Sequence, residues 1–258
     1  MKTVGDIFSY LDKIAPFKNQ DISDNSGLIV GRYDAEVEKI LICLDLTNKV
    51  VAEAIEKGSN LIITHHPPMY HPVSKTVSDD LIKALARSNI NLITAHTNLD
   101  IAVGGIADLM LARLDFPKSY TVILPVNPDG SGYGRVVDLD TPVFANDLAK
   151  KCKDVFDCTI VRYVDSGKAL TKIGVTSGSA EESVQAALDA GCDAFICGEV
   201  KYYGMLFAAD YGLTLIEAGH FHTEDIFCED LAERLKARFK EIEIMKSKNS
   251  IDVYEYSV

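Results

Sequence analysis

Residues 39–66 read KILICLDLTNKVVAEAIEKGSNLIITHH, and this stretch indicates the fold class. Its two ends, Lys39–Leu44 and Asn60–Thr64, are short apolar runs rich in β-branched residues, which favour β-strands. Between them, Lys49–Lys57 has its apolar residues at helical spacing. A strand, a helix and a second strand in this order are typical of a parallel sheet that is covered by helices.

The same alternation continues through the chain. A helix at Ser78–Arg87 and a strand at Asn91–Ala95 complete the first series. A second series follows, with strands at Lys172–Thr176, Ala194–Cys197 and Thr214–Ala218 and helices at Ala180–Ala190 and Met205–Tyr211. The sequence therefore predicts an α/β protein with mixed, mostly parallel sheets flanked by helices.

The two series resemble each other, which indicates an internal duplication. At a shift of 133 positions and without a gap, residues 39–66 lie over residues 172–199 with six identities in 28. Each series also follows a later strand with His-x-x-x-carboxylate, as His96 to Asp100 and as His220 to Glu224. We therefore predict two related α/β lobes, residues 1–124 and 125–258.

A Pro, Gly, Asn and Asp-rich segment, Pro125–Gly134, is predicted to join or flank these lobes. After it we expect a strand at Arg135–Leu139, a helix that starts near Thr141 and Pro142, and a strand at Thr159–Val164.

The composition is that of an ordinary globular protein, with 47% apolar and 25% charged residues. A net charge of -12 and a pI near 4.9 oppose non-specific binding to nucleic acid, which depends on Lys and Arg. Met1–Pro16 is too polar for a signal peptide and is predicted to form an amphipathic helix capped by Thr3 and Asp6, so we expect a cytoplasmic protein. No apolar run reaches the roughly 18 residues that span a bilayer. The six cysteines form no CxxC pair and are predicted to be reduced and buried.

The sharpest functional signal is LIITHHPP at residues 61–68. A predicted strand ends here in His65 and His66, and two prolines prevent its continuation. In an open α/β sheet, ligand sites lie beyond the carboxyl ends of the strands, so both imidazoles reach that edge. At a strand end, adjacent histidines can serve two ions about 3.5–4 Å apart. The alternative is a surface loop with a histidine pair.

Two further strand ends supply the other candidate ligands. Asp100 follows the strand at Asn91–Ala95, and His220 and Glu224 follow the strand at Thr214–Ala218. Imidazoles and carboxylates together suit Zn, Fe or Mn, and a carboxylate can bridge two ions. We therefore predict two divalent metal ions per chain, with Glu224 as the bridge. The predicted ligands are His65, His66, Asp100, His220 and Glu224.

Other residues near these strand ends have weaker signals. His96 and His222 either orient a ligand or move protons, or they are structural histidines. Under the duplication, the segment Cys197–Tyr203 occupies the place of the double histidine, so Glu199 and Lys201 are expected to face the same cleft, and a solvated ion pair is the alternative. His96 and Glu199 are the candidate catalytic residues. Thr176–Ser179 is a weak candidate for phosphate binding through backbone N–H groups, and Asp24–Gly27 is interpreted as a turn.

Five segments together carry a family resemblance: DNSGLIVG (24–31), ITHHP (63–67), AHTNLD (95–100), CGEVKYY (197–203) and AGHFHTE (218–224). With them, almost the whole chain resembles the GTP cyclohydrolase type 2 homologs, also called the NIF-three-like family. The resemblance implies a two-lobed fold built by duplication, a dinuclear metal site in the cleft between the lobes, and a ring-shaped homohexamer. It places the five predicted ligands on the family's ligand positions, with Glu224 as the bridge.

Three positions depart from the family pattern. Ser23 replaces an aromatic residue that often precedes the Asp-Asn-x-Gly element, Cys197 replaces a threonine, and Tyr203 replaces a common histidine. If that histidine moves protons in relatives, another group must do so here. The chain is also too short for the extra central domain of longer relatives.

The resemblance implies a metal-dependent hydrolase of a nucleotide, with opening of the imidazole ring of GTP as the suggested reaction. Its metals would generate hydroxide from water near neutral pH, His96 or Glu199 would relay protons, and Lys201 and Arg135 would contact phosphate. Two alternatives stay open. One is a metal-dependent phosphoesterase, and the other is a non-catalytic, ring-shaped protein that binds metal and protein partners.

Overall fold

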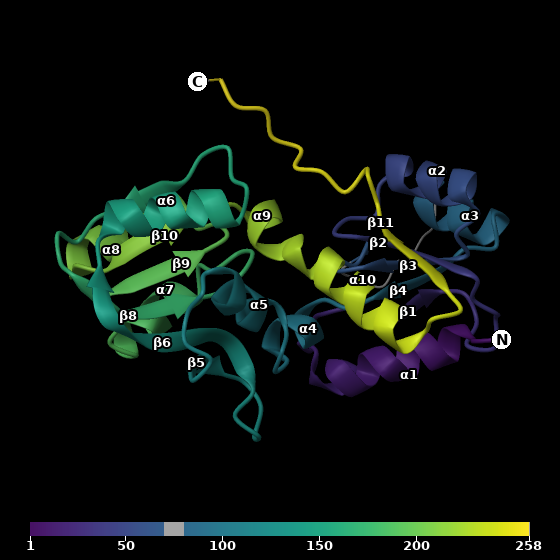
Figure 1. Ribbon diagram of the computed structural model, residues 1–258, viewed down its shortest axis with the longest axis horizontal. Coiled ribbons are helices and arrows are strands. Elements are labelled where there is room, and N and C mark those ends of the chain that lie inside the picture. Colours follow the sequence, from purple (N-terminus) through teal and green to yellow (C-terminus); the bar gives the residue numbers. More distant parts are fainter. Residues whose placement is uncertain (70–79, 258) are drawn as a thin grey trace. The chain divides into compact units, whose positions relative to one another are not determined.

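The computed structural model describes residues 1–69 and 80–257, which form two compact units (Figure 1). Unit 1 comprises Met1–Leu99 and Phe227–Ile251, and unit 2 comprises Asp100–Ile226 and Asp252–Val258. This division differs from the predicted boundary at residues 124 and 125, because the last helix and strand of the chain belong to unit 1. The α/β class with two mixed sheets is confirmed.

Unit 1 is built on a five-stranded sheet with the order β1-β4-β3-β2-β11. The strands are β1 (Gly27–Val30), β2 (Lys39–Cys43), β3 (Leu61–Thr64), β4 (Asn91–Thr94) and β11 (Glu243–Lys246). The helices are α1 (Val4–Ile14), the 3₁₀ turn η1 (Phe17–Asn19), α2 (Asn48–Lys57), α3 (Asp80–Arg87), α4 (Thr97–Ile101, which continues into unit 2) and α10 (Ile226–Arg238). All neighbouring strands are parallel except β1, which is antiparallel to β4.

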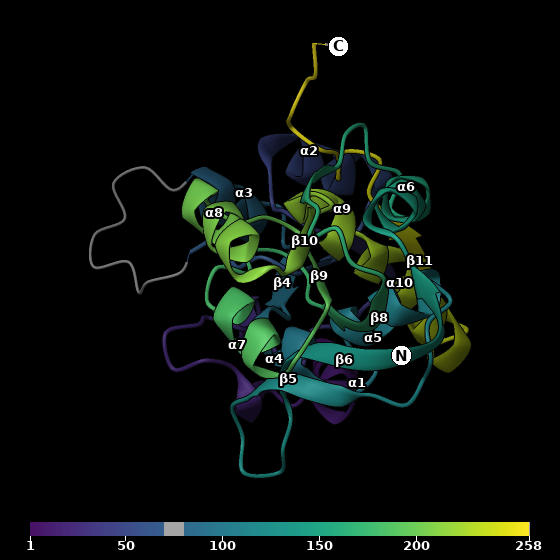
Figure 2. The ribbon, with the colours of Figure 1, turned by 90° about the vertical axis from the view of Figure 1, so that its left-hand side faces the viewer.

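Helices cover both faces of this sheet. Leu41 and Cys43 of β2 belong to a buried cluster with residues of α2 and α3. Ile40 and Ile42 point to the opposite face and are equally buried, since successive strand residues alternate between faces. On that second side lie α1 and α10 (Figures 1 and 2). Burial on both faces explains why the central strands read as continuous apolar runs.

The first helix begins where its cap was predicted. The Thr3 side chain accepts a hydrogen bond from the backbone N–H of Asp6, and the Asp6 carboxylate accepts one from the backbone N–H of Thr3. This reciprocal pair satisfies two donors that a helix N-terminus leaves without intrahelical partners.

Unit 2 is built on a six-stranded sheet with the order β5-β6-β8-β9-β10-β7. The strands are β5 (Thr121–Pro125), β6 (Gly132–Val143), β7 (Arg162–Val164), β8 (Leu170–Val175), β9 (Ala194–Cys197) and β10 (Thr214–Glu217). The helices are α5 (Ile106–Arg113), α6 (Ala145–Val155), α7 (Ser183–Asp189), α8 (Tyr202–Tyr211) and α9 (His220–Glu224). In Figure 2, α7 and α8 lie on one side of the strands and α6 lies on the other.

The two sheets share a motif that supports the internal duplication. β2, β3 and β4 are parallel neighbours with an antiparallel edge strand, and β8, β9 and β10 repeat this order. The pairing register is also the same at the shift of 133, since Ile40 pairs with Leu61 and Ile173 pairs with Ala194. Gly58 and its counterpart Gly191 both adopt left-handed backbone conformations after a helix, with φ of 68° and 74°.

Two predictions for the middle of the chain are wrong in detail. Residues 126–131 form a hairpin turn between β5 and β6 inside unit 2, so Pro125–Gly134 does not join the units. Thr141 and Pro142 lie in β6, and α6 starts only at Ala145. An irregularity in the β6–β8 pairing between Asp138 and Val143 lets the strand accommodate the proline. The predicted helix start at Ser78 lies outside the described residues.

The six cysteines are buried and form no disulfide bond. Burial raises the pKa of Cys152 and Cys158 to about 12, which keeps these thiols protonated and unreactive. Across residues 1–69 and 80–257, no helix combines the length and apolar character needed to cross a membrane.

Candidate metal centre

The carboxyl end of β3 delivers two histidines. Thr64, the last residue of the strand, forms a buried hydrogen bond of 2.8 Å between its hydroxyl and that of Thr94 on β4. His65 follows and is fully buried, with Nδ1 at 2.8 Å from the carbonyl oxygen of Ala95. A carbonyl only accepts, so Nδ1 must donate, and the lone pair of the neutral ring lies on Nε2.

His66 is held in the same way by a carboxylate. Its Nδ1 lies 2.8 Å from Oδ1 of Asp45, a residue that follows the end of β2. The imidazole is mostly buried, whereas the Asp45 side chain is half exposed. The sequence analysis missed Asp45, although it stands just past a strand end like the predicted ligands.

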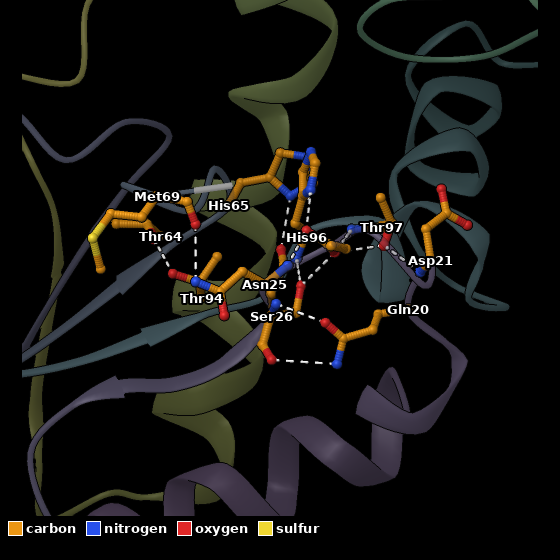
Figure 3. Close-up of polar contacts among 12 residues, drawn as sticks. Gln20, Asp21, Asn25, Ser26, Thr64, His65, Met69, Thr94, His96 and Thr97 are labelled. Carbon is orange, nitrogen blue, oxygen red and sulfur yellow. Dashed lines mark hydrogen bonds and ion pairs between the residues drawn. The ribbon is translucent and has the colours of Figure 1, made fainter. Parts of the chain in front are cut away.

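His96 is oriented by Asp24, which was interpreted only as part of a turn. Nδ1 of His96 donates to Oδ1 of Asp24 at 2.8 Å, and Oδ2 of Asp24 accepts from the hydroxyls of Ser26 and Thr97. Figure 3 shows the imidazoles of His65 and His96 close together beside this network. Burial alone would raise the pKa of Asp24, but the hydrogen bonds from His96 and Thr97 outweigh it and hold that pKa well below its ordinary value. Asp24 is therefore a fixed negative charge.

These three histidines converge within unit 1. One ring nitrogen from each of His65, His66 and His96 lies within 4.8 Å of the other two, a spacing that could hold a metal ion. The ring centroids of His65 lie 5.1 Å from those of both His66 and His96. The predicted pair of ligands thus has a third imidazole beside it.

In unit 2, α9 carries His220 and Glu224 one turn apart. Nε2 of His220 lies 3.0 Å from Oε2 of Glu224, and Nδ1 lies 3.0 Å from Oε1 of Glu199. Glu199 follows β9, and its carboxylate contacts the imidazole of His220 directly. Glu224 is almost fully buried, whereas 47% of the Glu199 side chain is exposed.

Glycines allow the strand-end loops of unit 2 to approach α9. Gly178 has a φ of 58°, and a Cβ atom there would lie 2.0 Å from Oε1 of Glu224 and 3.3 Å from Nε2 of His220. Its backbone N–H donates to the Thr223 hydroxyl. The neighbouring Ser177 hydroxyl donates to Oδ1 of Asp100 at 3.5 Å. The 176–179 segment, a weak candidate for phosphate binding, therefore packs against the metal candidates.

Other residues singled out from the sequence have structural partners. Arg135 is buried, and its guanidinium binds Asp108 and the carbonyls of Ala102, Gly132 and Gly134. This corrects its expected role in phosphate binding, because its donors are used inside unit 2. His222 pairs with Asp252 at 3.2 Å. Lys201 and Tyr203 are exposed at the start of α8.

The shared feature of these clusters is the orientation of the imidazoles. His65, His66, His96 and His220 each direct Nδ1 at an oxygen acceptor. Metal-binding histidines nearly always have such a partner, which fixes the tautomer and raises the basicity of the coordinating nitrogen. The structure thus contains clusters of His and Glu side chains that could bind a metal.

Comparisons with known proteins agree with the family resemblance. A Clostridium perfringens protein named GTP cyclohydrolase 1 type 2 homolog is 33% identical over 264 residues, which cover 98% of this chain and 99% of the relative. A Clostridium acetobutylicum protein of the same name is 34% identical over 265 residues, with 98% of both chains covered. A crystal structure of a Staphylococcus aureus hypothetical protein has a TM-score of 0.90 at 26% identity and covers 99% of both chains.

The family model described as Duf34/NIF3 (NGG1p interacting factor 3) matches residues 2–252. Because this match and both relatives extend over nearly the entire chain, the protein belongs to the Duf34/NIF3 family.

Proposed function

We propose that this protein is a hydrolase that depends on two divalent metal ions and acts on a nucleotide. The proposed ligands are His65, His66, Asp100, His220 and Glu224. The observation that carries the proposal is the orientation of the three histidines in this set, each of which directs Nδ1 at an oxygen acceptor. Nε2 of each ring is then the coordinating atom.

The donor set fits Zn, Fe or Mn. Neutral imidazoles and carboxylates bind these ions well, and the charge of two carboxylates offsets part of the charge of two ions. Gly178 supports the assignment, since only a residue without Cβ leaves room for the Glu224 carboxylate at its position. Glu224 is the proposed bridge.

Both units contribute ligands in this proposal. His65 and His66 belong to unit 1, whereas Asp100, His220 and Glu224 belong to unit 2. In the sequence, Asp100 directly follows Leu99, where the first segment of unit 1 ends, and Glu224 shortly precedes Phe227, where its second segment begins.

When bound, two such ions would act as Lewis acids that promote the ionisation of water and polarise the substrate. The residues of the chain then have two proposed tasks. His96 accepts a proton at Nε2 while Asp24 holds Nδ1, and this pairing fixes the ring during the transfer. Glu199 positions His220 through the contact at Nδ1, and its exposure allows it to pass protons to solvent.

The proposed reaction is hydrolysis of the imidazole ring of GTP, with release of the ring carbon C8 as formate. The names of the Clostridium relatives support this choice. Lys201 remains the proposed phosphate contact, since it is exposed two residues after Glu199.

Metal content and product release, measured on the same preparations, test this function. Wild-type protein loaded with Zn, Fe or Mn is expected to hold about two ions per chain and to release formate from GTP. Glu224→Ala should bind fewer ions and release none, whereas Glu233→Ala, at an exposed position on α10, should match wild type. Less than about half an ion per chain in wild type would overturn the proposal. Phosphate release without formate would identify a phosphoesterase, and metal without turnover would identify a non-catalytic binding protein.

We further propose that the chain assembles as a ring-shaped homohexamer in the cytoplasm, as the family resemblance implies. A hexamer of this 28.3 kDa chain is expected in native mass spectrometry at about six times the monomer mass. A monomer or dimer as the dominant species at micromolar concentration would contradict this assembly.

A further inference from the structure

We infer that unit 1 can bind one divalent transition-metal ion by itself, through Nε2 of His65, His66 and His96. This inference rests on the metal-binding part of the proposed function and adds His96 as a third imidazole ligand. All three residues belong to unit 1, so no ligand of unit 2 is required.

The first support is convergence. One ring nitrogen from each histidine lies within 4.8 Å of the other two, and the three ring centroids are separated by 5.1 Å, 5.1 Å and 5.6 Å. Small rotations of the rings would bring these atoms to the positions around one ion, since Zn–N bonds measure about 2.0–2.1 Å.

The second support is the common orientation of the rings. Nδ1 donates to the Ala95 carbonyl in His65, to Asp45 in His66 and to Asp24 in His96. The three acceptors come from different segments of unit 1, yet each leaves Nε2 as the atom with the lone pair. Packing in a protein core does not require three neighbouring histidines with the same ring orientation. A metal ion, in contrast, can be coordinated by three imidazole lone pairs at once.

The third support is the rigidity of the frame that holds the rings. The hydroxyls of Thr64 and Thr94 join the ends of β3 and β4, and the hydrogen bond from His65 to Ala95 continues this connection. Asp24 accepts further hydrogen bonds from Ser26 and Thr97 while it holds His96. Side chains fixed in this way lose little conformational entropy when they bind an ion.

The donor set defines the class of ion. Three neutral imidazoles favour Zn, Fe, Co and Ni over Mg and Ca, which prefer oxygen ligands. His96 would serve as a ligand only while unit 1 holds a single ion, and in the proposed two-ion centre its Nε2 would accept a proton instead.

The test uses the full-length chain and Co²⁺ as the probe. A His220→Ala/Glu224→Ala variant removes two unit 2 ligands, and its cobalt content and visible absorption are measured after removal of other metals. We expect about one Co²⁺ per chain, with the absorption bands of a low-coordinate site. Adding His96→Asn should weaken Co²⁺ binding by about 10-fold or more.

His96→Asn is chosen because the amide nitrogen of Asn replaces Nδ1 as the donor to Asp24 while Nε2 is lost. Adding His222→Asn instead is the matched control, since it removes an imidazole that is paired with Asp252 and should leave the retained ion unchanged. Circular dichroism verifies that each variant is folded.

The outcomes separate this inference from the proposed function. Two ions in wild type and none in the double variant would overturn the three-histidine site and leave the two-ion centre intact. One ion in both proteins would support the three-histidine site and contradict the two-ion centre. Unchanged Co²⁺ affinity after His96→Asn would exclude His96 as a ligand.

Discussion

Hydrogen-bond partners of the histidines should control metal affinity at the level of single residues. Asp45 holds Nδ1 of His66, so Asp45→Ala frees the ring to rotate and lowers the basicity of Nε2. We expect the affinity for Zn²⁺ to fall about 10- to 100-fold, measured by competition with a chromophoric chelator. Asp34→Ala, which breaks an exposed ion pair with Arg32, is the control and should leave the affinity unchanged. Equal affinities for the two variants would refute a role of Asp45 in the site.

A substitution at Gly178 tests how closely the Glu224 side chain packs against this position. In Gly178→Ala the new Cβ atom would lie 2.0 Å from Oε1 of Glu224, so the carboxylate must move away. Gly167→Ala is the matched control in the same unit, because Gly167 has a similar φ of 71° but nothing within 4 Å of the added atom. Both variants should be destabilised by about 1–2 kcal/mol through backbone strain in chemical denaturation. Only Gly178→Ala should also lose metal, and retention of the full metal content there would show that Glu224 is not a ligand.

The sequence predicts candidate site residues only where they follow the ends of recognisable strands. Five candidate ligands were selected because apolar runs end directly or shortly before them in the sequence: His65, His66, Asp100, His220 and Glu224. The partners that orient the histidines were not found, since Asp24 meets His96 across 72 positions of the chain. A local sequence pattern cannot reveal a contact between two residues that are this far apart in the sequence.

The duplication has a testable consequence in the turns between helix and strand. Asn60 accepts hydrogen bonds from the backbone N–H groups of Glu38 and Lys39, and Asp193 does the same for Thr171 and Lys172, at the shift of 133. Asn60 directly precedes β3, and Asp193 directly precedes β9. Each side chain accepts hydrogen bonds from two backbone N–H groups at corresponding positions. Position 193 therefore requires an acceptor oxygen, which Asn can also provide.

Stability should depend on pH at this position. Burial raises the pKa of Asp193, but the backbone N–H groups of Lys172 and Thr171 outweigh it and lower that pKa below 3.8. A depressed pKa stabilises the fold above 3.8, and this contribution is lost as the pH falls through 3.8 toward the lowered value. We expect Asp193→Asn to be less stable than wild type by about 0.5–1.5 kcal/mol at pH 7 in urea denaturation. The difference should shrink at about pH 3.5. A difference that stays constant with pH would contradict this linkage.

Elements of the sheet interiors were easier to predict than those at the edges. β3 and β9 are fully buried, and their apolar runs marked them almost to the residue. The edge strands β1, β5 and β11 were missed, because they are short and partly exposed. Edge positions leave one side of a strand without a partner, so their residue preferences are weaker.

At the scale of the whole chain, the division into units depends on pairings that are distant in sequence. β11 pairs in parallel with β2, so the last strand of the chain completes the first sheet. Met245 contacts the same core cluster as Leu41 of β2. No pattern in the sequence shows that residues 243–246 pair with β2, so the predicted boundary at residue 124 placed these residues in the second lobe.

Metal binding should stabilise unit 1. Each unit has its own buried core, so chelated protein is expected to unfold in two resolved calorimetric transitions. The proposed three-histidine site lies in unit 1 alone, and an ion that binds only the folded unit stabilises it by about 2.7 kcal/mol at 100 times its Kd. We therefore expect excess Zn²⁺ to raise the melting temperature of unit 1 in Glu224→Ala and to leave the transition of unit 2 unshifted. Identical thermograms of this variant with chelator and with Zn²⁺ would contradict metal binding by unit 1.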